Sequence, residues 1–518
     1  MRSRFSRLLL LAGSVAVLLL AVGCNDTLRQ FITPVPAPTG DPGTLAHAIT
    51  VSTNPAANAV PAPVSTSGSD MHIDVSGDSA AGIVSVGLNP IFLGVSAGRA
   101  FVINNGDASN PPTVSVYPAL SPLAVTVSTV TLPTTGPNAV LTPIAGGTSS
   151  TGNIYIANNG SNNVSVIGGG VLAVSATVPL PAGDTHPVMI AGNASNNKIF
   201  VVNQNSGSGN VTEISTIDNT VIKDIPVGSQ PIWAVMSTDG LFVFVVNQGD
   251  GTVSVIDTSL DAIVACTVGP SCPSGNAIKV GLTGSPSPNF AFYDPTLKRV
   301  YVSNTGEGSI SVINANNITA SNPPAKVKDI LVSGKPTSVT ALANGTRAYA
   351  VLGNCPAGVN HITLPGTNTA NNTSSCTGNL VSVIDTVGLQ ETGTIPVGSG
   401  AVSIASSSDS SRVFVISAND ITTVRDDVHA PNCTDTTCLP GSPLPDRTFP
   451  TPSISIIKTS TNSVLATPVN PGVVNSPLPT FHLPQQDPNC VAAVDPNFND
   501  DVVLPCPLQT PFQVVTFP

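Results

Sequence analysis

The repetition of one hairpin constrains the fold of this chain more than any other feature. In the clearest copy, an apolar β-prone run at 242–246 leads into Asn247 and a Gln-Gly-Asp-Gly turn, and a second apolar run follows at 252–256. Asn, Asp and Gly tolerate the positive φ angles of tight turns, so this stretch predicts two antiparallel strands. The copies are aligned on one aromatic in the first strand: Phe101, Tyr155, Phe200, Phe244, Tyr301, Tyr349 and Phe414.

The spacing of these copies predicts the architecture. Successive aromatics are at least 44 residues apart, as between Phe200 and Phe244, and the longer steps indicate added loops. A repeat of this length is typical of the four-stranded blades of a β-propeller. We expect strand A after a recurrent Pro, the hairpin strands B and C, and an outer strand D. The sequence thus predicts an all-β, seven-bladed β-propeller of four-stranded antiparallel blades.

The two ends of the array leave a second arrangement open. Residues 71–75 and 82–86 resemble strands C and D without a preceding A–B pair, and the seventh copy has its own candidate strand D at 463–467. An N-terminal strand could complete the last of seven blades. Alternatively, the spare N-terminal pair and the C-terminal tail could form a composite closing blade, the eighth. We expect the propeller at 69–470 and a disulfide-stapled tail at 471–518, which could complete it.

Several smaller motifs recur in a fixed order. Five copies have Asn three residues after the aromatic, Val-Ser-Val-Ile-Asp marks strand C, and Ile-Pro-Val-Gly precedes the next Pro; Leu352 and Ser417 replace the Asn in the last two copies. Together these motifs resemble the YVTN β-propeller repeat family over roughly residues 70–470. The resemblance implies a propeller. It implies little about chemistry, because such propellers serve as scaffolds, as surface proteins and in some cases as enzymes.

The N-terminus has the pattern of an export signal. Three arginines precede an apolar run at 8–21, which is too short to span a bilayer comfortably. The run ends in Ala-Val-Gly-Cys24, which resembles a bacterial lipobox with Ala21 where Leu is commoner. We predict a lipoprotein signal peptide at 1–23 and lipidation of Cys24, the alternative being an ordinary signal peptide with an incidental Cys. The Pro-, Ala-, Thr- and Ser-rich segment 24–68 is predicted to be a flexible tether.

These features place the mature chain outside the cytoplasm of a bacterium, as a monomer anchored to a membrane by acyl chains. Asn25 does not match the Asp that retains lipoproteins in the inner membrane of enteric bacteria, which favours the outer membrane. Net charge is −11, and removal of the three signal arginines takes it to −14 (−11 − 3). Nucleic-acid binding needs clustered Lys and Arg, so this composition excludes that class. Charged residues are 9% of the chain, which leaves few charges to protect strand edges.

The cysteine pattern predicts disulfides. If Cys24 carries lipid, the other eight of the nine cysteines fall into local pairs, each of which brackets a Pro-, Gly- or Asn-rich insertion. Eight cysteines allow 105 connectivities, of which we favour nearest-neighbour pairing. No C-x-x-C occurs and no His is interleaved at ligand spacing, so no metal site and no cofactor are predicted. The predicted pairs are Cys266/Cys272, Cys355/Cys376, Cys433/Cys438 and Cys490/Cys506.

Three long insertions distinguish this chain from a regular array of repeats. Those at 353–379 and 419–452 both fall between strands B and C, whereas the one at 266–286 follows or interrupts a strand D. In an antiparallel four-stranded blade, the B–C and D–A loops emerge on one face. We therefore expect the B–C insertions to share a face with a polar ring at the funnel, formed by residues beside the recurrent Pro. The candidates are Asn89, Asn138, His186, Gln230, Ser287 and Lys335, with Gly400 in the last copy.

Signatures of catalysis are thin. The chain has no G-x-S-x-G, H-E-x-x-H, P-loop or EF-hand pattern. Asp184 and His186 could form an acid–base pair, but their spacing is more typical of a solvated loop. Trp233 is more typical of a packing residue than of a stacking platform for a ligand. The favoured function is a lipid-anchored binding or structural scaffold of the cell envelope, with a protein or glycan partner on its loop-rich face. The alternative is a propeller enzyme, lactonase-like or quinone-dependent, with its site in the funnel.

Overall fold

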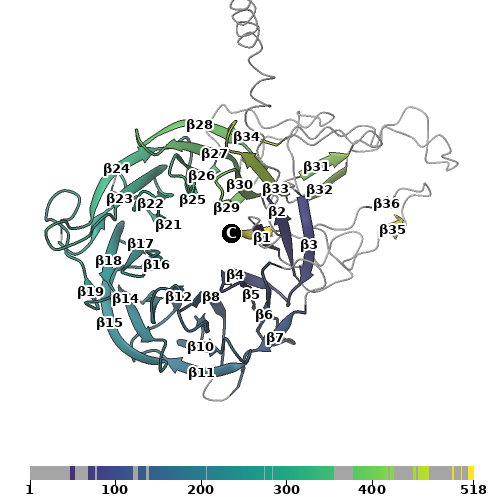
Figure 1. The fold of residues 1–518 in the computed structure, drawn as a ribbon, viewed down its shortest axis with the longest axis horizontal. Helices are drawn as coiled ribbons and strands as arrows, with labels where there is room; N and C mark the ends of the chain where they lie inside the picture. The colour runs from purple at the N-terminus through teal and green to yellow at the C-terminus, as the bar shows by residue number, and fades with distance from the viewer. Residues whose placement is uncertain are drawn as a thin grey trace, which may run out of the picture. The chain divides into compact units, whose positions relative to one another are not determined.

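The repeats form antiparallel blades arranged around an axis (Figure 1). The computed structural model describes residues 47–52, 68–75, 79–120, 126–135, 139–205, 207–273, 275–282, 284–354, 377–398, 400–417, 421–424, 447–450, 453–465, 493–494, 503–504 and 511–517. All regular structure in these ranges is β, and none of it is a helix that could cross a membrane. The all-β propeller predicted from the repeats is confirmed.

Seven blades follow one another along the chain, each with strand A innermost. Blade I consists of β4 (Pro90–Ser96), β5 (Arg99–Asn104), β6 (Thr113–Pro118) and β7 (Ser128–Thr131). Blade II consists of β8 (Pro143–Thr148), β9 (Ile154–Asn158), β10 (Asn163–Ile167) and β11 (Val174–Pro179). Blade III consists of β12 (Pro187–Ala191), β13 (Lys198–Asn203), β14 (Ser208–Ser215) and β15 (Thr220–Ser229). Blade IV consists of β16 (Pro231–Met236), β17 (Phe242–Asn247), β18 (Thr252–Asp257) and a strand D in two pieces, β19 (Ala262–Ile263) and β20 (Ile278–Lys279). Blade V consists of β21 (Pro288–Asp294), β22 (Arg299–Asn304), β23 (Ser309–Asn314) and β24 (Ala325–Leu331). Blade VI consists of β25 (Pro336–Ala341), β26 (Arg347–Asn354), β27 (Thr377–Asp385) and β28 (Gln390–Pro396). Blade VII consists of β29 (Ala401–Ser406), β30 (Arg412–Ser417), β33 (Ser453–Lys458) and β34 (Ser463–Val464).

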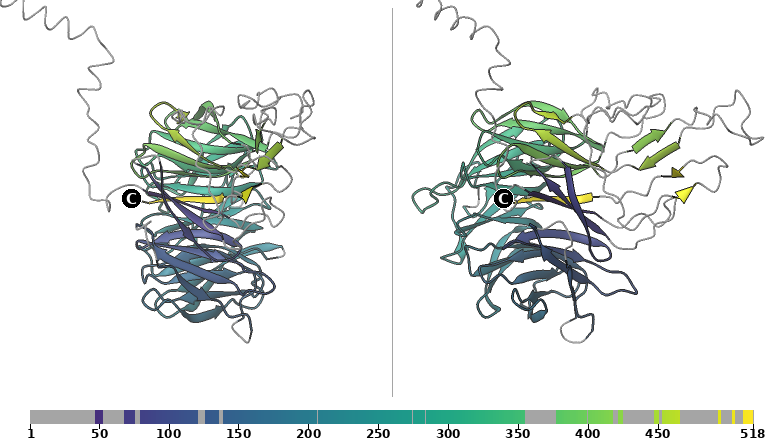
Figure 2. Two further views of the ribbon diagram at one scale, coloured as in Figure 1. Left: turned by 90° about the vertical axis from the view of Figure 1, so that its right-hand side faces the viewer. Right: turned by 45° about the vertical axis from the view of Figure 1, so that its right-hand side comes forward.

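An eighth blade is built from both ends of the chain. Its strands, from the axis outward, are β37 (Pro511–Phe517), β1 (His47–Ser52), β2 (Ser69–Asp74) and β3 (Ser79–Ser85). Figure 2 shows the yellow C-terminal strand beside the purple N-terminal ones. The prediction of seven blades is therefore wrong and the alternative with a composite closing blade is correct. Blade VII has its own strand D, β34, so the N-terminal strands have no place in it.

The N-terminal boundary expected from the sequence differs in the structure, whereas the C-terminal range completes the ring as the sequence allowed. The range 24–68 was expected to be a tether, yet it contains β1, which pairs with β2 on one side and β37 on the other. The C-terminal range 471–518 contributes β37 to the ring and the separate hairpin of β35 (Ala493–Val494) and β36 (Val503–Leu504). A six-residue strand among Pro, Ala, Thr and Ser residues leaves too short a periodic signal to be recognised.

The innermost strands close the ring. Contacts run in order through β4, β8, β12, β16, β21, β25, β29 and β37, and β37 contacts β4 again. Gln513 in β37 makes two hydrogen bonds to the backbone of Leu93 in blade I, at 2.8 and 2.9 Å. On the other side, the Thr516 hydroxyl donates to the carbonyl of Ser406 in blade VII at 2.6 Å. The closing blade is thereby joined to both of its neighbours.

The aromatics that align the repeat are core residues of strand B. Phe101 is 3% exposed and the other six are 0% exposed. Their neighbours in the core come from adjacent blades; Tyr155 of blade II, for example, packs with Ile190 and Ile199 of blade III. Burial of such a side chain contributes about 1.5–3 kcal/mol, so the aromatics hold the blades face to face.

The recurrent Asn at the end of strand B anchors the B–C turn. In blade IV, Asn247 Nδ2 lies 3.0 Å from both Thr252 Oγ1 and Ser254 Oγ, which explains the Ser of the Val-Ser-Val motif. The same Asn explains the Gly of the Val-Gly motif: a Cβ on Gly228 would lie only 2.7 Å from Asn247 Cγ, so a larger residue would not fit there. Where Leu352 replaces Asn in blade VI, the hydroxyl of Ser382 is buried without a partner.

A partly buried cluster of charged side chains links blades III and IV through Lys198. Lys198 Nζ in β13 lies 2.6 Å from the fully buried Glu213 carboxylate of β14 and also contacts Asp261 of blade IV. Burial outweighs the attraction of Lys198 and raises the pKa of Glu213 to about 7. The Glu213 carboxyl group therefore binds its proton more tightly in the folded protein than in the unfolded chain, where its pKa is near the ordinary value of 4.5.

We expect Glu213→Gln to flatten the pH dependence of stability. The contribution of a raised carboxyl pKa is present in full below about 4.5 and is lost as pH rises through about 7. Melting temperatures measured by circular dichroism should therefore fall less for the variant than for the wild type across this window. Asp218→Asn is the control, because Asp218 is an exposed residue of the same blade and its carboxyl pKa is lowered. The melting temperature of this variant should depend on pH as that of the wild type does. Equal slopes for wild type and Glu213→Gln would contradict this assignment.

Candidate functional site

The residues immediately before strand A form a recurring set on one face of the ring. We call this set the crown: Asn89, Thr142, His186, Gln230, Ser287, Lys335 and Gly400. The sequence identified six of these positions and proposed Asn138 for blade II. Asn138 lies outside the described residues, and Thr142 is the residue that precedes β8. Two candidate prolines lie six residues apart there, Pro137 and Pro143, and only the second begins a strand.

The crown has a constrained backbone. Asn89, Thr142, His186, Gln230 and Ser287 all have positive φ, between 43° and 55°, a conformation that costs a non-glycine residue roughly 1–3 kcal/mol. Hydrogen bonds to the adjacent B–C turns hold several of these residues in place. The amide of Asn105 donates to Asn89 O at 2.8 Å, and that of Gln248 donates to Gln230 O at 3.0 Å.

These hydrogen bonds show that the D–A connectors and the B–C turns share a face. The pattern recurs in blade II, where the Asn159 amide donates to Thr142 O at 2.9 Å, and in blade III, where the Gln204 amide donates to His186 O at 3.1 Å. The B–C insertion of blade VII begins on this face after β30 and contains a small hairpin, β31 (Ile421–Val424) with β32 (Arg447–Pro450). The arrangement of loops expected from topology is confirmed for the described residues.

Most side chains of the crown are exposed to solvent, and the Asn89 amide also donates to Gly106 O at 2.6 Å. Asn89, Thr142, His186, Gln230 and Lys335 are exposed and Ser287 is partly exposed. Immediately after the crown, every strand A of blades I to VII has a register shift typical of a β-bulge, as between Pro231 and Trp233. The crown therefore presents two amides, hydroxyls, one imidazole and one ammonium from equivalent positions of a rigid ring.

Trp233 packs between the innermost strands of two neighbouring blades, as its position in strand A suggests. Its Nε1 donates to Ala291 O of blade V at 3.1 Å, and its ring lies 4.7 Å from that of Phe290. The side chain is partly exposed. It contributes packing between the innermost strands of two blades.

One predicted disulfide is present. Cys266 and Cys272 are bonded and buried against the core of blades IV and V. Their insertion interrupts strand D, because β19 and β20 pair with opposite ends of β18. This settles the position left open by the sequence. Cys24 and the six remaining cysteines, Cys355, Cys376, Cys433, Cys438, Cys490 and Cys506, lie outside the described residues.

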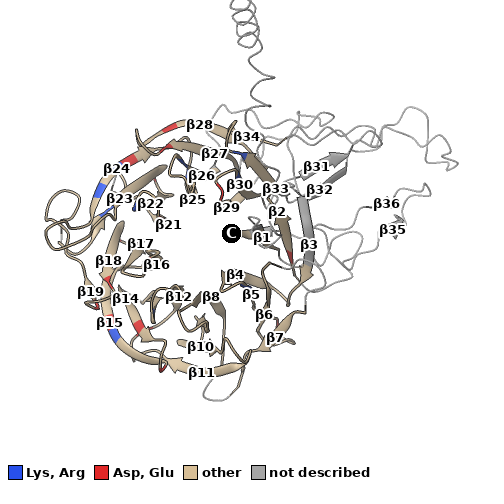
Figure 3. Cartoon of the chain, viewed as in Figure 1, with Lys and Arg blue, Asp and Glu red and all other residues tan. Residues whose placement is uncertain are grey.

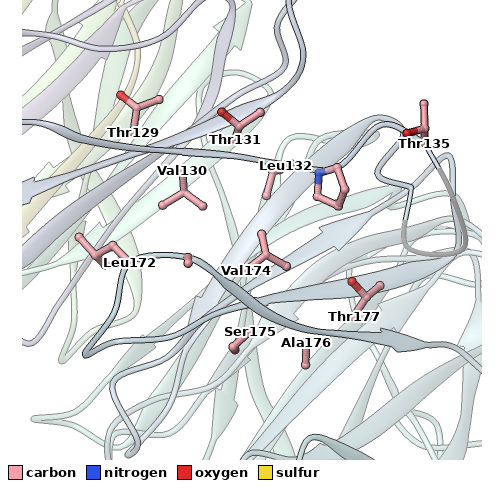
Figure 4. Close-up of a pocket in the computed structure, with 12 residues that line it drawn as sticks. Thr129, Val130, Thr131, Leu132, Thr135, Leu172, Val174, Ser175, Ala176 and Thr177 are labelled. Atoms are coloured by element: carbon pink, nitrogen blue, oxygen red, sulfur yellow. The ribbon is translucent and has the colours of Figure 1, made fainter.

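A groove lies between the outer strands of blades I and II (Figure 4). It has a volume of about 590 Å³; Val130, Leu132 and Val174 point into it, while Thr129 and Thr131 point away. Neither β7 nor β11 has a charged residue, in contrast to β15, β24 and β28 (Figure 3). The two neighbouring strand edges therefore lack the charges that β15, β24 and β28 have on theirs.

Asp184 is not the solvated loop residue that the sequence suggested. It is 6% exposed, and Thr212 Oγ1 donates to its Oδ2 at 2.8 Å. Burial, with a smaller effect of the nearby Asp184 carboxylate, raises the pKa of Asp224 in β15. Asp184 lies two residues before the crown residue His186 in the chain. An Asp in strand D opposite a strand-C hydroxyl was the sequence signal for this cluster.

Within the described residues, no group of three or more His, Cys, Asp or Glu side chains gathers as a potential metal site.

Comparison with known proteins supports the fold alone. No protein-family model matches the chain, and no curated protein matches it. The fold is similar to AztD from Citrobacter koseri, with a TM-score of 0.51 and 9% identity over 92% of this chain and 98% of that one. It is also similar to the dihydro-heme d1 dehydrogenase NirN in complex with DHE, with a TM-score of 0.52 and 12% identity over 82% and 73% of the two chains. A putative 6-phosphogluconolactonase from Bacteroides fragilis aligns with a TM-score of 0.46 and 14% identity over 69% and 97%, and no argument rests on it.

Proposed function

We propose that the mature protein is a lipid-anchored binding scaffold of the bacterial envelope, of the YVTN repeat type, which holds a protein or glycan partner on the crown face. The observation that carries this proposal is the crown itself. Several of its residues share a strained backbone conformation and hydrogen bonds to the adjacent turns, while the side chains of Thr142, His186, Gln230 and Lys335 are exposed to solvent. A preorganised array loses little conformational entropy on binding, so even modest polar contacts yield affinity.

The chemistry of the crown suits a partner rich in hydroxyl and carbonyl groups. Amide, hydroxyl and imidazole side chains donate and accept hydrogen bonds, and Lys335 adds one positive charge. The innermost strands behind the crown have almost no charged residues, as the tan centre of Figure 3 shows. A neutral or weakly anionic surface, such as a glycan or an extended protein segment, complements this face.

We expect the double variant His186→Ala/Gln230→Ala to weaken partner binding without loss of the fold. Photo-crosslinking in cells, with the reactive residue at exposed Lys335, should yield one defined adduct that is reduced in the double variant. The matched control Thr238→Ala/Ser408→Ala changes two exposed residues in A–B turns, on the opposite ends of the strands. It should leave the adduct unchanged. If the control reduces the adduct and the crown variant does not, the partner binds elsewhere.

Membrane anchoring has its own test. Cys24→Ser should abolish incorporation of labelled fatty acid and release the protein from the membrane fraction, because the acyl chains are the proposed anchor. Cys266→Ser, at a cysteine occupied by a disulfide, is the control and should retain the label. Retained label in Cys24→Ser would refute lipidation at this residue.

A further inference from the structure

The turns between strands C and D have exposed aliphatic side chains on one face of the ring. Because strand direction alternates, the C–D and A–B turns lie on the face opposite the crown, which we call the base. Four aliphatic side chains in C–D turns are between 71% and 88% exposed, and in the described ranges only one other large aliphatic side chain, that of Val268 at 72%, is exposed to this extent. The four, from blades II, III, IV and VI, are Val171, Ile217, Leu260 and Val387.

Each of these four turns is held in place by the preceding blade. In three of them, a basic residue that begins strand B of that blade donates to a backbone carbonyl of the turn. In blade III, Asn219 Oδ1 accepts instead from the Tyr155 hydroxyl of blade II at 3.0 Å. The three basic contacts are Arg99 Nη1 to Gly169 O at 2.6 Å, Lys198 Nζ to Thr258 O at 2.9 Å and Arg299 Nη1 to Thr386 O at 2.5 Å. The turns are therefore fixed in a position that leaves their aliphatic side chains in water.

The fold itself does not require apolar residues at these places. In blades V and VII, the exposed residues of the C–D turns include Asn316 and Thr461. Single exposed aliphatic residues are common on protein surfaces, but these four recur in one kind of turn, on one face and with similar support. Their transfer from water to an apolar phase is favourable. The base therefore has the features of a surface that contacts an apolar partner.

The chain enters the ring on this same face. β1 begins at His47, which is paired with Phe517 at the end of β37. This end lies at the base, because strand A begins at the crown and Thr516 bonds to Ser406, the last residue of the neighbouring strand A. Cys24, the proposed lipidation site, precedes His47 by 23 residues (47 − 24). The proposed anchor is thus attached to the ring at the base, and the crown lies one strand length further along.

We propose that the base rests on a phospholipid bilayer, with Val171, Ile217, Leu260 and Val387 at the boundary between headgroups and acyl chains. This inference rests on the proposed membrane anchoring and adds an orientation to it. Apolar side chains at this boundary strengthen membrane binding in proportion to the apolar area that they bury. With the base on the membrane, the crown faces away from the lipid and stays accessible to a partner.

The test is photolabelling of the full-length protein, purified from membranes and reconstituted with vesicles of phosphatidylethanolamine and phosphatidylglycerol. A fraction of the lipid has a photoreactive group on its acyl chain, and mass spectrometry locates the labelled residues. Labels should lie in the C–D turns of blades II, III, IV and VI and be absent from the crown.

A triple variant tests the aliphatic side chains themselves. Ile217→Asn/Leu260→Asn/Val387→Asn should lower labelling of the unchanged turn around Val171 by about tenfold or more, because burial of one such side chain already contributes a factor of that size. The matched control, which should leave this labelling unchanged, alters three exposed leucines on the crown side: Leu141→Asn/Leu282→Asn/Leu331→Asn. All six side chains are exposed, so both variants should keep the melting temperature of the wild type.

The outcomes separate this inference from the proposed anchor. Labels on the crown, or equal labelling of both faces, would overturn the orientation even if the protein carries fatty acid and floats with the vesicles. Labels at the base of a vesicle-bound protein without fatty acid would support the orientation and refute lipidation of Cys24. Failure to float with vesicles would overturn the proposal, and so would a dimer in detergent that the triple variant abolishes, because a second copy would then occupy the base.

Discussion

The pairing of β37 with β1 is the contact on which the rest of the structure depends. Without it, the seven complete blades would form an open arc whose two end blades each present a whole unpacked face. Such faces consist of apolar side chains, since each blade packs its core residues on the next. The closing blade covers both at once: Leu93 of blade I and Ser406 of blade VII are hydrogen-bonded to the same seven-residue strand. Few charged residues protect this chain from association at open edges, so closure is its main protection.

Closure also fixes where functional groups can lie. Because every blade alternates strand direction in the same way, the connectors before strand A and the turns after strand B meet on one face. The positions of the crown and of Asp184 follow from this geometry. The crown residues come from the ends of the connectors, and Asp184 comes from the middle of one connector, where it meets the strand-D residue Asp224. A single face therefore combines the exposed hydrogen-bonding groups of the crown with the buried carboxylate of Asp184.

The sequence alone predicted those parts of the fold that depend on residues close together in the chain. The B–C hairpins, the buried aromatics and the Cys266–Cys272 bond each depend on residues close together in the chain. The Val-Gly motif has an equally local meaning, since Gly228 makes room for Asn247. These features could be read from one repeat and checked against the others.

The parts that could not be predicted depend on distant residues. Val51 in β1 is paired with Gln513 in β37, which lies 462 residues (513 − 51) further along the chain. Neither strand has a sequence pattern that identifies the other as its partner, so the sequence alone left the number of blades open. Thr142 was missed because two prolines compete for the start of strand A in blade II. The burial of Asp184 depends on the register of β14 and β15, which brings Thr212 and Asp224 together; in sequence it is an unremarkable residue of a polar loop.

Ring closure through β37 is most directly tested by hydrogen exchange, followed by mass spectrometry, on the peptide that covers 511–517. If β37 is the innermost strand of a closing blade, its amides should exchange as slowly as those of β16 or β21, which are innermost strands of complete blades. Exchange of this peptide within seconds, at the rate of an unstructured tail, while β16 and β21 remain protected, would contradict an eight-bladed ring closed by both ends of the chain.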